Sequence, residues 1–107
     1  MGHASITAVE GLAKQLGAVY HLPPAVAYEH AGISSMNGRT DEATETVSLE
    51  DFETMLAFAQ QKHLARLTFW SVNRDRSCAG ADTTPDSCSG VAQQPLAFTR
   101  VIAQYHG

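Results

Sequence analysis

Apolar residues return along the chain at two different spacings, one typical of helices and one typical of short strands. Over residues 5–20 they recur every three or four positions, which places them on one face of a helix. The residues on that face are Ile6, Val9, Ala13, Leu16 and Tyr20. Pro24 suits the first turn of a second helix, predicted over residues 24–30. A short strand is then predicted over residues 32–36.

A third helix is predicted over residues 49–62, after a polar loop that spans residues 37–46. Ser48 is a good N-cap for this helix, and Asp51 three positions later can complete a capping box. The acidic residues of the first turn suit the positive end of the helix dipole, so they need no catalytic explanation. The predicted buried stripe comprises Phe52, Met55, Leu56 and Ala59.

The last two predicted elements enclose the longest polar stretch of the chain. Residues 66–70 are bulky or β-branched for the most part and predict a buried strand that ends in Trp70. A long loop rich in Ser, Asp, Gly and Thr follows over residues 71–93. The final helix is predicted over residues 95–105, with Pro95 in its first turn.

The predicted order is therefore helix, helix, strand, helix, strand, helix. Such alternation indicates an α/β fold in which parallel strands are joined by right-handed crossovers. The connections that enter the two strands are short, whereas those that leave them, residues 37–46 and 71–93, are long. In βα barrels the long loops after the strands carry the functional site. We therefore expect the site at the carboxyl ends of the two strands.

The chain turns polar directly after the second predicted strand. Trp70 is followed within five residues by Ser71, Asn73, Arg74 and Asp75. One interpretation is a core tryptophan before an ordinary solvated loop, since buried tryptophans are common. The other is a ligand contact at the functional end of the sheet. Both interpretations are open from the residues alone.

The length, residues 1–107, allows one small domain or a piece of a larger one. The chain has 44% hydrophobic residues, as globular proteins do, and a formal net charge of −4. This charge argues against non-specific nucleic-acid binding, which needs basic patches. No membrane partner is expected, because no apolar run approaches the roughly 20 residues that span a bilayer. Residues 1–5 lack the basic region and apolar core of a signal peptide. We expect a soluble chain that is either cytosolic or already freed of its export signal.

Histidines and cysteines are the natural candidates for a metal site. His21 and His30 have no cysteine or carboxylate at ligand spacing from both, so helix-end positions explain them better, as for His63. Cys78 and Cys88 share one polar loop, which favours a disulfide of a secreted protein. A zinc site is the alternative, but it would lack a nearby pair of histidines. No metal or other cofactor is expected.

Several segments together resemble the carboxyl end of actinobacterial-type chitinases, which belong to family 18 of the glycoside hydrolases. The segment Gly32–Gly38 is similar to the seventh strand of that family, and Glu45–Asp51 is similar to the start of the helix that follows. The resemblance is carried furthest by Trp70–Arg76, then by Cys88–Gln93 and Phe98–Thr99. It covers nearly the whole chain in one register.

This resemblance implies a partial (βα)8 TIM barrel, made of the last two βα units and the helices before them. The eighth strand of the family ends in a tryptophan that forms the floor of the sugar-binding subsite at the scissile bond. Trp70 matches that position. Met36, at the end of the neighbouring strand, would lie beside it. Asn73 and Arg74 would orient the following loop rather than contact the sugar.

The resemblance also implies that catalytic chemistry lies outside this chain. The catalytic acid of the family ends an Asp-x-x-Asp-x-Asp-x-Glu run, which does not occur here, so no catalytic residue is expected. The chain departs from the family pattern at Arg39–Thr40, where a Gln-Asn-like pair would precede Asp41. The sugar contacts of the first long loop are therefore left open.

Three functional hypotheses follow from these observations. The first is the carboxyl-terminal part of a secreted chitinase-like hydrolase that acts on β-1,4-linked N-acetylglucosamine polymers. Its partners would be chitin or chito-oligosaccharides and the remainder of the barrel. The alternative is a small carbohydrate-binding or accessory module without hydrolase activity. A third hypothesis is a cytosolic α/β domain in which Trp70 binds no ligand.

Overall fold

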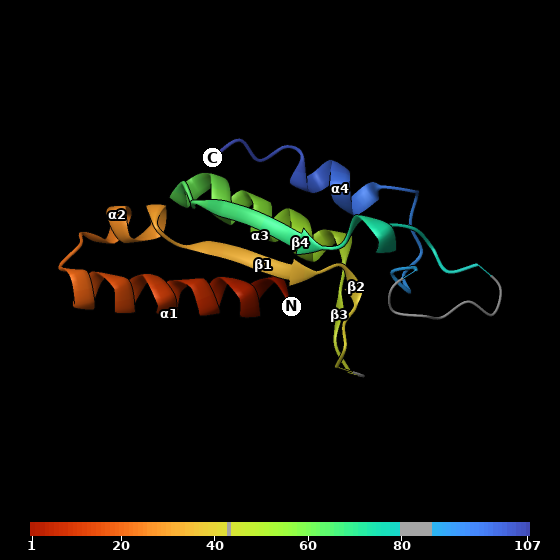
Figure 1. Ribbon diagram of the computed structural model, residues 1–107, viewed down its shortest axis with the longest axis horizontal. Coiled ribbons are helices and arrows are strands. Elements are labelled where there is room, and N and C mark those ends of the chain that lie inside the picture. The colour runs from red at the N-terminus through yellow and green to blue at the C-terminus, as the bar shows by residue number, and fades with distance from the viewer. Residues whose placement is uncertain (43, 80–86) are drawn as a thin grey trace.

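A computed structural model describes residues 1–42, 44–79 and 87–107, in which helices and two short sheets alternate along the chain (Figure 1). The elements are α1 (Gly2–Tyr20), α2 (Pro24–Glu29), β1 (Gly32–Met36), β2 (Gly38–Arg39), β3 (Thr46–Val47), α3 (Leu49–Lys62), β4 (Arg66–Trp70), a 3-10 helix η1 (Val72–Arg74) and α4 (Ala97–Ile102). Among these helices, none combines the length and the apolarity that crossing a membrane requires.

Strands β1 and β4 form the central sheet and run parallel to each other. Their pairing extends from Gly32 opposite Arg66 to Met36 opposite Trp70, without a bulge. Helix α3 connects them, which makes β1–α3–β4 a crossover unit joining two neighbouring parallel strands. The mixed α/β fold and the parallel pairing predicted from the sequence are confirmed, and both strands end at the same edge.

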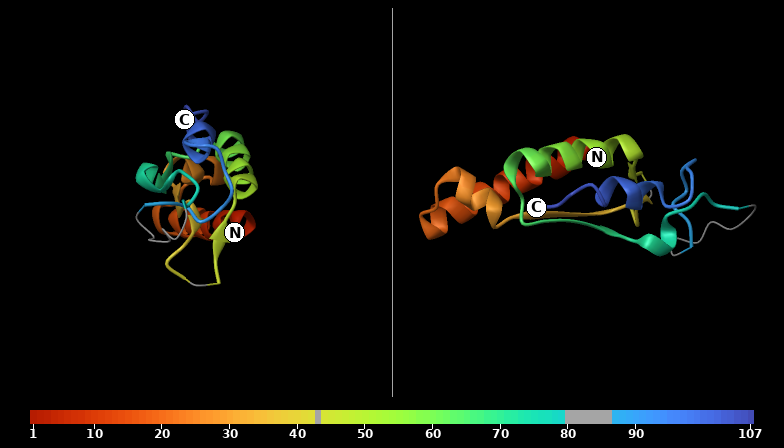
Figure 2. Two further views of the ribbon diagram at one scale, coloured as in Figure 1. Left: turned by 90° about the vertical axis from the view of Figure 1, so that its right-hand side faces the viewer. Right: turned by 90° about the horizontal axis from the view of Figure 1, so that it is seen from above.

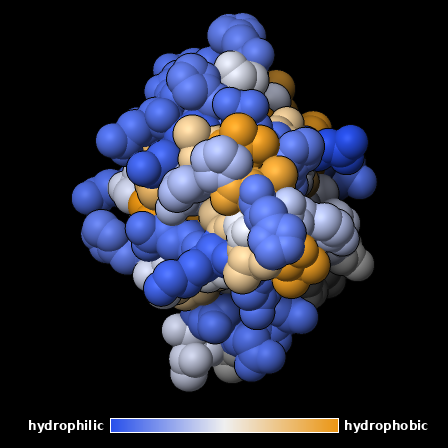
Figure 3. All heavy atoms as spheres, turned by 90° about the vertical axis from the view of Figure 1, so that its left-hand side faces the viewer, coloured by the Kyte–Doolittle hydropathy of each residue, from blue (hydrophilic) through white to orange (hydrophobic). Residues whose placement is uncertain are grey.

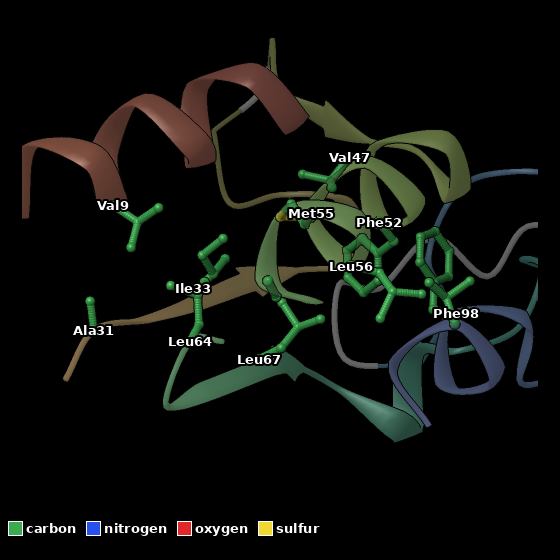
Figure 4. Packing of buried hydrophobic residues seen from close by; sticks show 12 residues of the cluster. Val9, Ala31, Ile33, Val47, Phe52, Met55, Leu56, Leu64, Leu67 and Phe98 are labelled. Atoms are coloured by element: carbon green, nitrogen blue, oxygen red, sulfur yellow. The ribbon is translucent and has the colours of Figure 1, made fainter. Parts of the chain in front are cut away.

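Helices α1, α3 and α4 all lie on one side of this sheet (Figures 1 and 2). Ile33 and Leu67, which face each other in the strand register, are buried against the helices, as Figure 4 shows. Phe52 of α3 forms the centre of the core, with its ring 4.7 Å from that of Phe98 and 5.8 Å from that of Phe69. The buried apolar residues of the core are Val9, Ala31, Ile33, Val47, Phe52, Met55, Leu56, Ala59, Leu64, Leu67, Phe98 and Val101.

Helix α3 begins as its sequence predicts. The Ser48 side chain accepts a hydrogen bond from the Asp51 N–H at 3.0 Å, and the Asp51 carboxylate accepts one from the Ser48 N–H at 2.8 Å. This capping box satisfies two backbone donors at the helix start. The same carboxylate accepts a hydrogen bond from the Gly2 N–H at 3.0 Å, so it joins the start of α1 to the start of α3.

The structure corrects the predicted bounds of α1. The helix begins at Gly2, three residues before the predicted start, because the Asp51 carboxylate holds the Gly2 N–H. Tyr20 shares the predicted apolar face with Val9 and Ala13, but it is 66% exposed whereas they are buried. The carboxyl end of α1 extends past the start of β1, so this end of the helix lies beyond the central sheet (Figure 1).

Two further predictions about loops and the last helix are wrong in detail. Within the predicted polar loop, β2 and β3 form a short antiparallel ladder. Two paired residues on each side are too few to produce a strand pattern in the sequence. Helix α4 begins at Ala97 after an N-cap at Leu96, so Pro95 lies before the helix rather than in its first turn.

Among the described residues, no helix or strand covers the sheet face opposite α1, α3 and α4 (Figure 2). This face presents Ser34 and Thr68, both exposed, and within the described ranges each strand of the central sheet pairs along one edge only. The molecule measures 52 × 26 × 18 Å and has a radius of gyration of 14.9 Å. A compact globule of this length would have about 13 Å. One uncovered face and two open strand edges explain the elongated shape.

We predict that the isolated chain associates, because open strand edges and an uncovered sheet face favour pairing with other chains. Light scattering coupled to size exclusion should show species larger than a monomer. Thr68→Lys places a charge on the bare face and should shift the distribution toward monomer, whereas Gln60→Lys on the exposed side of α3 should not. A strict monomer with a sharp, reversible melt would contradict the prediction.

Candidate functional site

The candidate site lies where β1 and β4 end. Trp70 is the last residue of β4 and is 48% exposed, and Met36 stands opposite it as the last residue of β1. Met36 is half-buried. The peptide bond between Trp70 and Ser71 is cis. The structure therefore brings the two predicted sugar-contacting residues side by side at the edge of the sheet.

Asn37 follows Met36 and is fully buried. Its backbone N–H donates to the Trp70 carbonyl at 3.2 Å. Its side chain accepts a hydrogen bond from the Ser71 N–H through Oδ1 at 2.9 Å and donates through Nδ2 to the Ser71 carbonyl at 3.2 Å. Asn37 thus forms hydrogen bonds with three successive polar atoms of the backbone: the Trp70 carbonyl oxygen, the Ser71 nitrogen and the Ser71 carbonyl oxygen.

Arg74 lies beneath this junction, although its charge would ordinarily favour solvent. It is fully buried at the end of η1. Its guanidinium donates to the carbonyl oxygens of Asn37 and Arg39 and, at 3.1 Å, to the Asn37 side-chain oxygen. The guanidinium carbon lies 5.6 Å from the centre of the Trp70 ring, within the range of a cation–π contact. Arg74 therefore links the residue that follows β1, the last residue of β2 and the indole.

Asn73, the other residue expected to orient this loop, is placed differently. It is exposed, and no side-chain hydrogen bond of Asn73 occurs among the residues that the structure describes. Arg74 contacts the strand ends directly. Among the described contacts, those of Arg74 and not those of Asn73 orient the backbone at the site.

Asp75 is buried one residue after η1 and caps the last helix from a distance in sequence. Its carboxylate accepts hydrogen bonds from the Phe98 N–H at 3.1 Å and from the N–H and hydroxyl of Thr99 at 2.7 and 2.6 Å. The Gln93 amide donates to it at 2.7 Å. Burial raises the pKa of this carboxyl, but the hydrogen bonds that it accepts outweigh burial, so its pKa lies below its ordinary value.

This arrangement makes Asp75 an unsuitable proton donor. A general acid must hold a proton at working pH, whereas the surroundings of Asp75 favour the ionised form. Asp51 is held in the same state: burial raises its pKa, and hydrogen bonds from backbone N–H groups outweigh burial. Both carboxylates belong to helix starts. The lowered pKa values of Asp51 and Asp75 are explained by hydrogen bonds at these helix starts and need no catalytic role.

The long loop after β4 returns to pack on the end of the site. The Arg39 N–H donates to the Ser89 carbonyl at 2.7 Å. Gly38 has a φ of 76°, and a Cβ at this position would lie 2.2 Å from the Ser89 carbonyl oxygen. Only glycine permits both this conformation and this close approach. The returning segment is therefore held against the start of the β2–β3 hairpin.

The Cys78–Cys88 disulfide closes the same loop, with a distance of 1.97 Å between the sulfur atoms. The predicted disulfide is confirmed, and these thiols are not available as zinc ligands. The residues between Ala79 and Ser87 lie outside the described part of the chain. The described ends of the loop are joined further by a hydrogen bond from the Ser89 N–H to the Arg76 carbonyl at 2.9 Å.

The histidines occupy the helix ends that the sequence predicts. His21, His30 and His63 follow α1, α2 and α3 as C-cap residues. His21 and His63 adopt the left-handed conformation that commonly ends a helix. Across residues 1–42, 44–79 and 87–107, no group of three or more His, Cys, Asp or Glu side chains is placed to bind a metal.

A separate cavity of about 520 Å³ lies between α1 and α2. Apolar surface also gathers at this end of the molecule (Figure 3), where Val19 and Tyr20 are 67% and 66% exposed. The cavity is lined by Glu10, Gly11, Ala13, Lys14, Gly17, Leu22, Pro24 and Tyr28. It lies away from the carboxyl ends of the strands, where the sites of parallel α/β sheets occur.

Sequence reasoning missed Asn37 and the inward position of Arg74. Asn37 precedes Gly38, and this pair was interpretable only as a turn signal. An arginine in a polar loop ordinarily points to solvent. The available signal was the position of Asn37 directly after a strand that pairs with the strand of Trp70. A buried polar side chain at that position is expected to form hydrogen bonds with the backbone N–H and carbonyl groups at the ends of both strands.

No family model matches the chain. A search of curated proteins likewise finds no match.

The fold itself has close structural neighbours. The chain superposes on the catalytic domain of a hyperthermophilic chitinase from Pyrococcus furiosus with a TM-score of 0.87 and 25% sequence identity. Catalytic-site mutants of active domain 2 of a thermostable chitinase from the same organism, complexed with chito-oligosaccharides, give 0.86 and 25%. Each match covers 96% of this chain and 34% of the solved chain. The chain therefore has the fold of about a third of a chitinase catalytic domain.

We predict that Asp75→Asn lowers the free energy of unfolding at neutral pH by roughly 1–3 kcal/mol, because a charged acceptor is lost from buried N–H groups. The lowered pKa of Asp75 also has a pH consequence. Its stabilisation is complete above about pH 5 and is lost as the pH falls below about 4 and through the folded-state pKa.

Denaturant unfolding at several pH values between neutral and acid tests this prediction. The variant should lose less stability on acidification than the parent chain. Asp41→Asn, at an exposed position, serves as the control and should behave like the parent. Equal acid sensitivity of the parent and Asp75→Asn would exclude Asp75 as the cause.

Proposed function

We propose that the chain is the carboxyl-terminal part of a family 18 chitinase-like glycoside hydrolase that acts on β-1,4-linked N-acetylglucosamine polymers. The observation that carries this proposal is the structural match to Pyrococcus furiosus chitinase catalytic domains over 96% of the chain. In the proposed barrel, β1 is the seventh strand and β4 is the eighth. The chain spans about a third of the solved catalytic domains, which leaves the other strands to be supplied from elsewhere.

The bare sheet face and the open strand edges are consistent with this assignment. Barrel strands pair on both edges, and their inner face is covered by side chains of the opposite strands. In the proposed barrel, Ser34 and Thr68 face the interior, while the edges of β1 and β4 pair with the strands before and after them. The partner of this surface is the remainder of the barrel.

Trp70 supplies the sugar-binding surface in this proposal. A half-exposed indole at the carboxyl end of a strand offers a flat apolar face to the C–H side of a pyranose ring. Met36, opposite in the strand register, extends that floor on one side. The site binds chitin or chito-oligosaccharides with a sugar ring lying on Trp70.

The catalytic acid comes from the remainder of the barrel. In the substrate-assisted mechanism, the N-acetyl oxygen of the sugar attacks the anomeric carbon while a protonated carboxyl transfers its proton to the departing glycosidic oxygen. The lowered pKa values of Asp51 and Asp75 make these carboxyls unsuitable for that step. This chain contributes binding and positioning rather than proton transfer.

The Cys78–Cys88 disulfide supports secretion of the parent protein, since such bonds persist in oxidising compartments.

We predict that the lone chain does not hydrolyse chitin oligomers, because its sequence lacks the Asp-x-x-Asp-x-Asp-x-Glu run that ends in the catalytic acid of the proposed family. Co-expression with a polypeptide that supplies the remaining strands and the catalytic acid should restore hydrolysis. The same complement with its acid replaced by the amide is the matched control and should stay inactive.

Two outcomes would contradict the proposal. Hydrolysis by the purified lone chain that disappears in Asp41→Asn would place the acid in this chain. Tight binding of chito-oligosaccharides by the lone chain, with no activity after complementation, would favour the accessory module instead.

We predict that Trp70→Ala in the complemented enzyme lowers turnover by roughly ten- to a hundredfold and weakens binding less, because positioning at the reacting ring is lost. The melting temperature should change little, since the side chain is half-exposed. Val72→Ala, which truncates a more exposed side chain nearby, is the control for surface effects.

Melting temperature and turnover of the one variant separate the alternatives. A collapsed melt, as expected for a core tryptophan whose truncation costs roughly 3–5 kcal/mol, would make Trp70 a packing residue. An unchanged melt with full activity would remove it from the site.

A further inference from the structure

Asn37 occupies an unusual place for a fully buried polar side chain. It directly follows β1, and its side chain forms two hydrogen bonds with the backbone of Ser71, the residue that directly follows β4. It accepts from the Ser71 N–H and donates to the Ser71 carbonyl, and its own N–H donates to the Trp70 carbonyl. The residue that carries the indole and the one after it are therefore both held by Asn37.

The amide side chain is chemically suited to this task. Only Asn and Gln offer a donor and an acceptor side by side, so one side chain can hold both polar groups of Ser71. An aspartate at position 37 would keep the acceptor for the Ser71 N–H but would face the Ser71 carbonyl without a donor. A leucine would be similar in size and would leave both groups of Ser71 without the hydrogen bonds that Asn37 provides.

Asn37 also connects the indole to Arg74. Its Oδ1 accepts from both the Ser71 N–H and the Arg74 guanidinium, at 2.9 and 3.1 Å, which uses both lone pairs of that oxygen. The Asn37 carbonyl accepts a second hydrogen bond from the same guanidinium. This guanidinium lies 5.6 Å from the centre of the Trp70 ring. Asn37 is thus connected to Trp70 in two ways. It binds the backbone next to Trp70, and it binds the Arg74 guanidinium that lies beside the indole ring.

We propose that Asn37 is a positioning residue that fixes the orientation of the Trp70 indole. Ser71 transmits its effect to the backbone of Trp70, and Arg74 transmits it to the ring. The inference rests on the proposed sugar-binding role of Trp70 and adds that the sugar ring lies on the indole face turned away from Arg74. A half-exposed tryptophan held in this way loses less conformational freedom when the sugar binds.

Trp70 is the only tryptophan in the chain, so intrinsic fluorescence reports on its side chain alone. Fluorescence anisotropy decay measures the motion of the indole, and acrylamide quenching measures its access to solvent. The variants are Asn37→Leu, which removes the hydrogen bonds of the side chain, and Asn37→Asp, which keeps the acceptor. Asn73→Ala, an exposed asparagine on η1, is the matched control. Far-ultraviolet circular dichroism establishes that each variant is folded.

The expected order of indole mobility and quenching is parent equal to Asn73→Ala, then Asn37→Asp, then Asn37→Leu. Wild-type mobility and quenching in Asn37→Leu would overturn the proposal. If Asn37→Leu does not fold, the test rests on Asn37→Asp. Wild-type indole mobility and quenching in Asn37→Asp would then overturn the proposal. In the complemented enzyme, Asn37→Asp should lower kcat by about tenfold with little change in KM.

The same signal separates this inference from the proposed function. Addition of chito-oligosaccharide to the complemented parent, with tryptophans of the complement replaced by phenylalanine, should change the Trp70 emission. Absence of that change would count against the sugar-binding role, even if Asn37 variants loosen the indole. A change on sugar addition together with unaltered indole mobility in both Asn37 variants would overturn only the positioning role.

Discussion

The parallel, in-register pairing of β1 and β4 is the constraint on which the rest of the structure depends. Because the strands run in the same direction and start level with each other, they also end level, and Met36 stands opposite Trp70. The candidate site comprises these two strand ends and residues of the loops that leave them. The crossover through α3 buries Ile33 and Leu67 on one face of the sheet and leaves the other face to solvent.

The end of the sheet is held by polar groups instead of apolar packing. Asn37, Arg74 and Asp75 are all buried, and no buried side-chain nitrogen or oxygen within the described ranges lacks a hydrogen-bond partner. Each of the three serves the backbone: Asn37 holds Ser71, Arg74 holds strand-end carbonyls, and Asp75 holds the start of α4. A buried polar network is stabilising only when fully satisfied, so a change in one member disturbs its neighbours.

The proposed barrel explains both the likeness to chitinase catalytic domains and the uncovered face of the sheet. A strand pair with one bare face is an unusual end state for an independent domain, but it is an expected part of a closed barrel. The match to about a third of the solved chitinase domains fits that explanation. In the proposed enzyme, this chain presents an aromatic surface and the remainder of the barrel supplies the acid.

The sequence by itself determined the local elements whose causes are local. The stripe that buries Phe52 and Ala59, the capping box at Ser48 and the strand that ends in Trp70 depend on residues close together in the chain. A hydrophobic pattern and a cap can therefore be predicted from spacing alone. The proximity of Cys78 and Cys88 in one loop likewise pointed to their disulfide.

Only the tertiary structure decided the features that join distant segments. Helix α4 begins at Ala97 because Asp75, more than twenty residues earlier, caps its N–H groups. Asn37 holds Ser71 across a separation of 34 residues, and neither residue carries a local signal of the other. Such contacts form once strand pairing has brought the segments together, because buried polar groups then take whichever partners lie within hydrogen-bond reach.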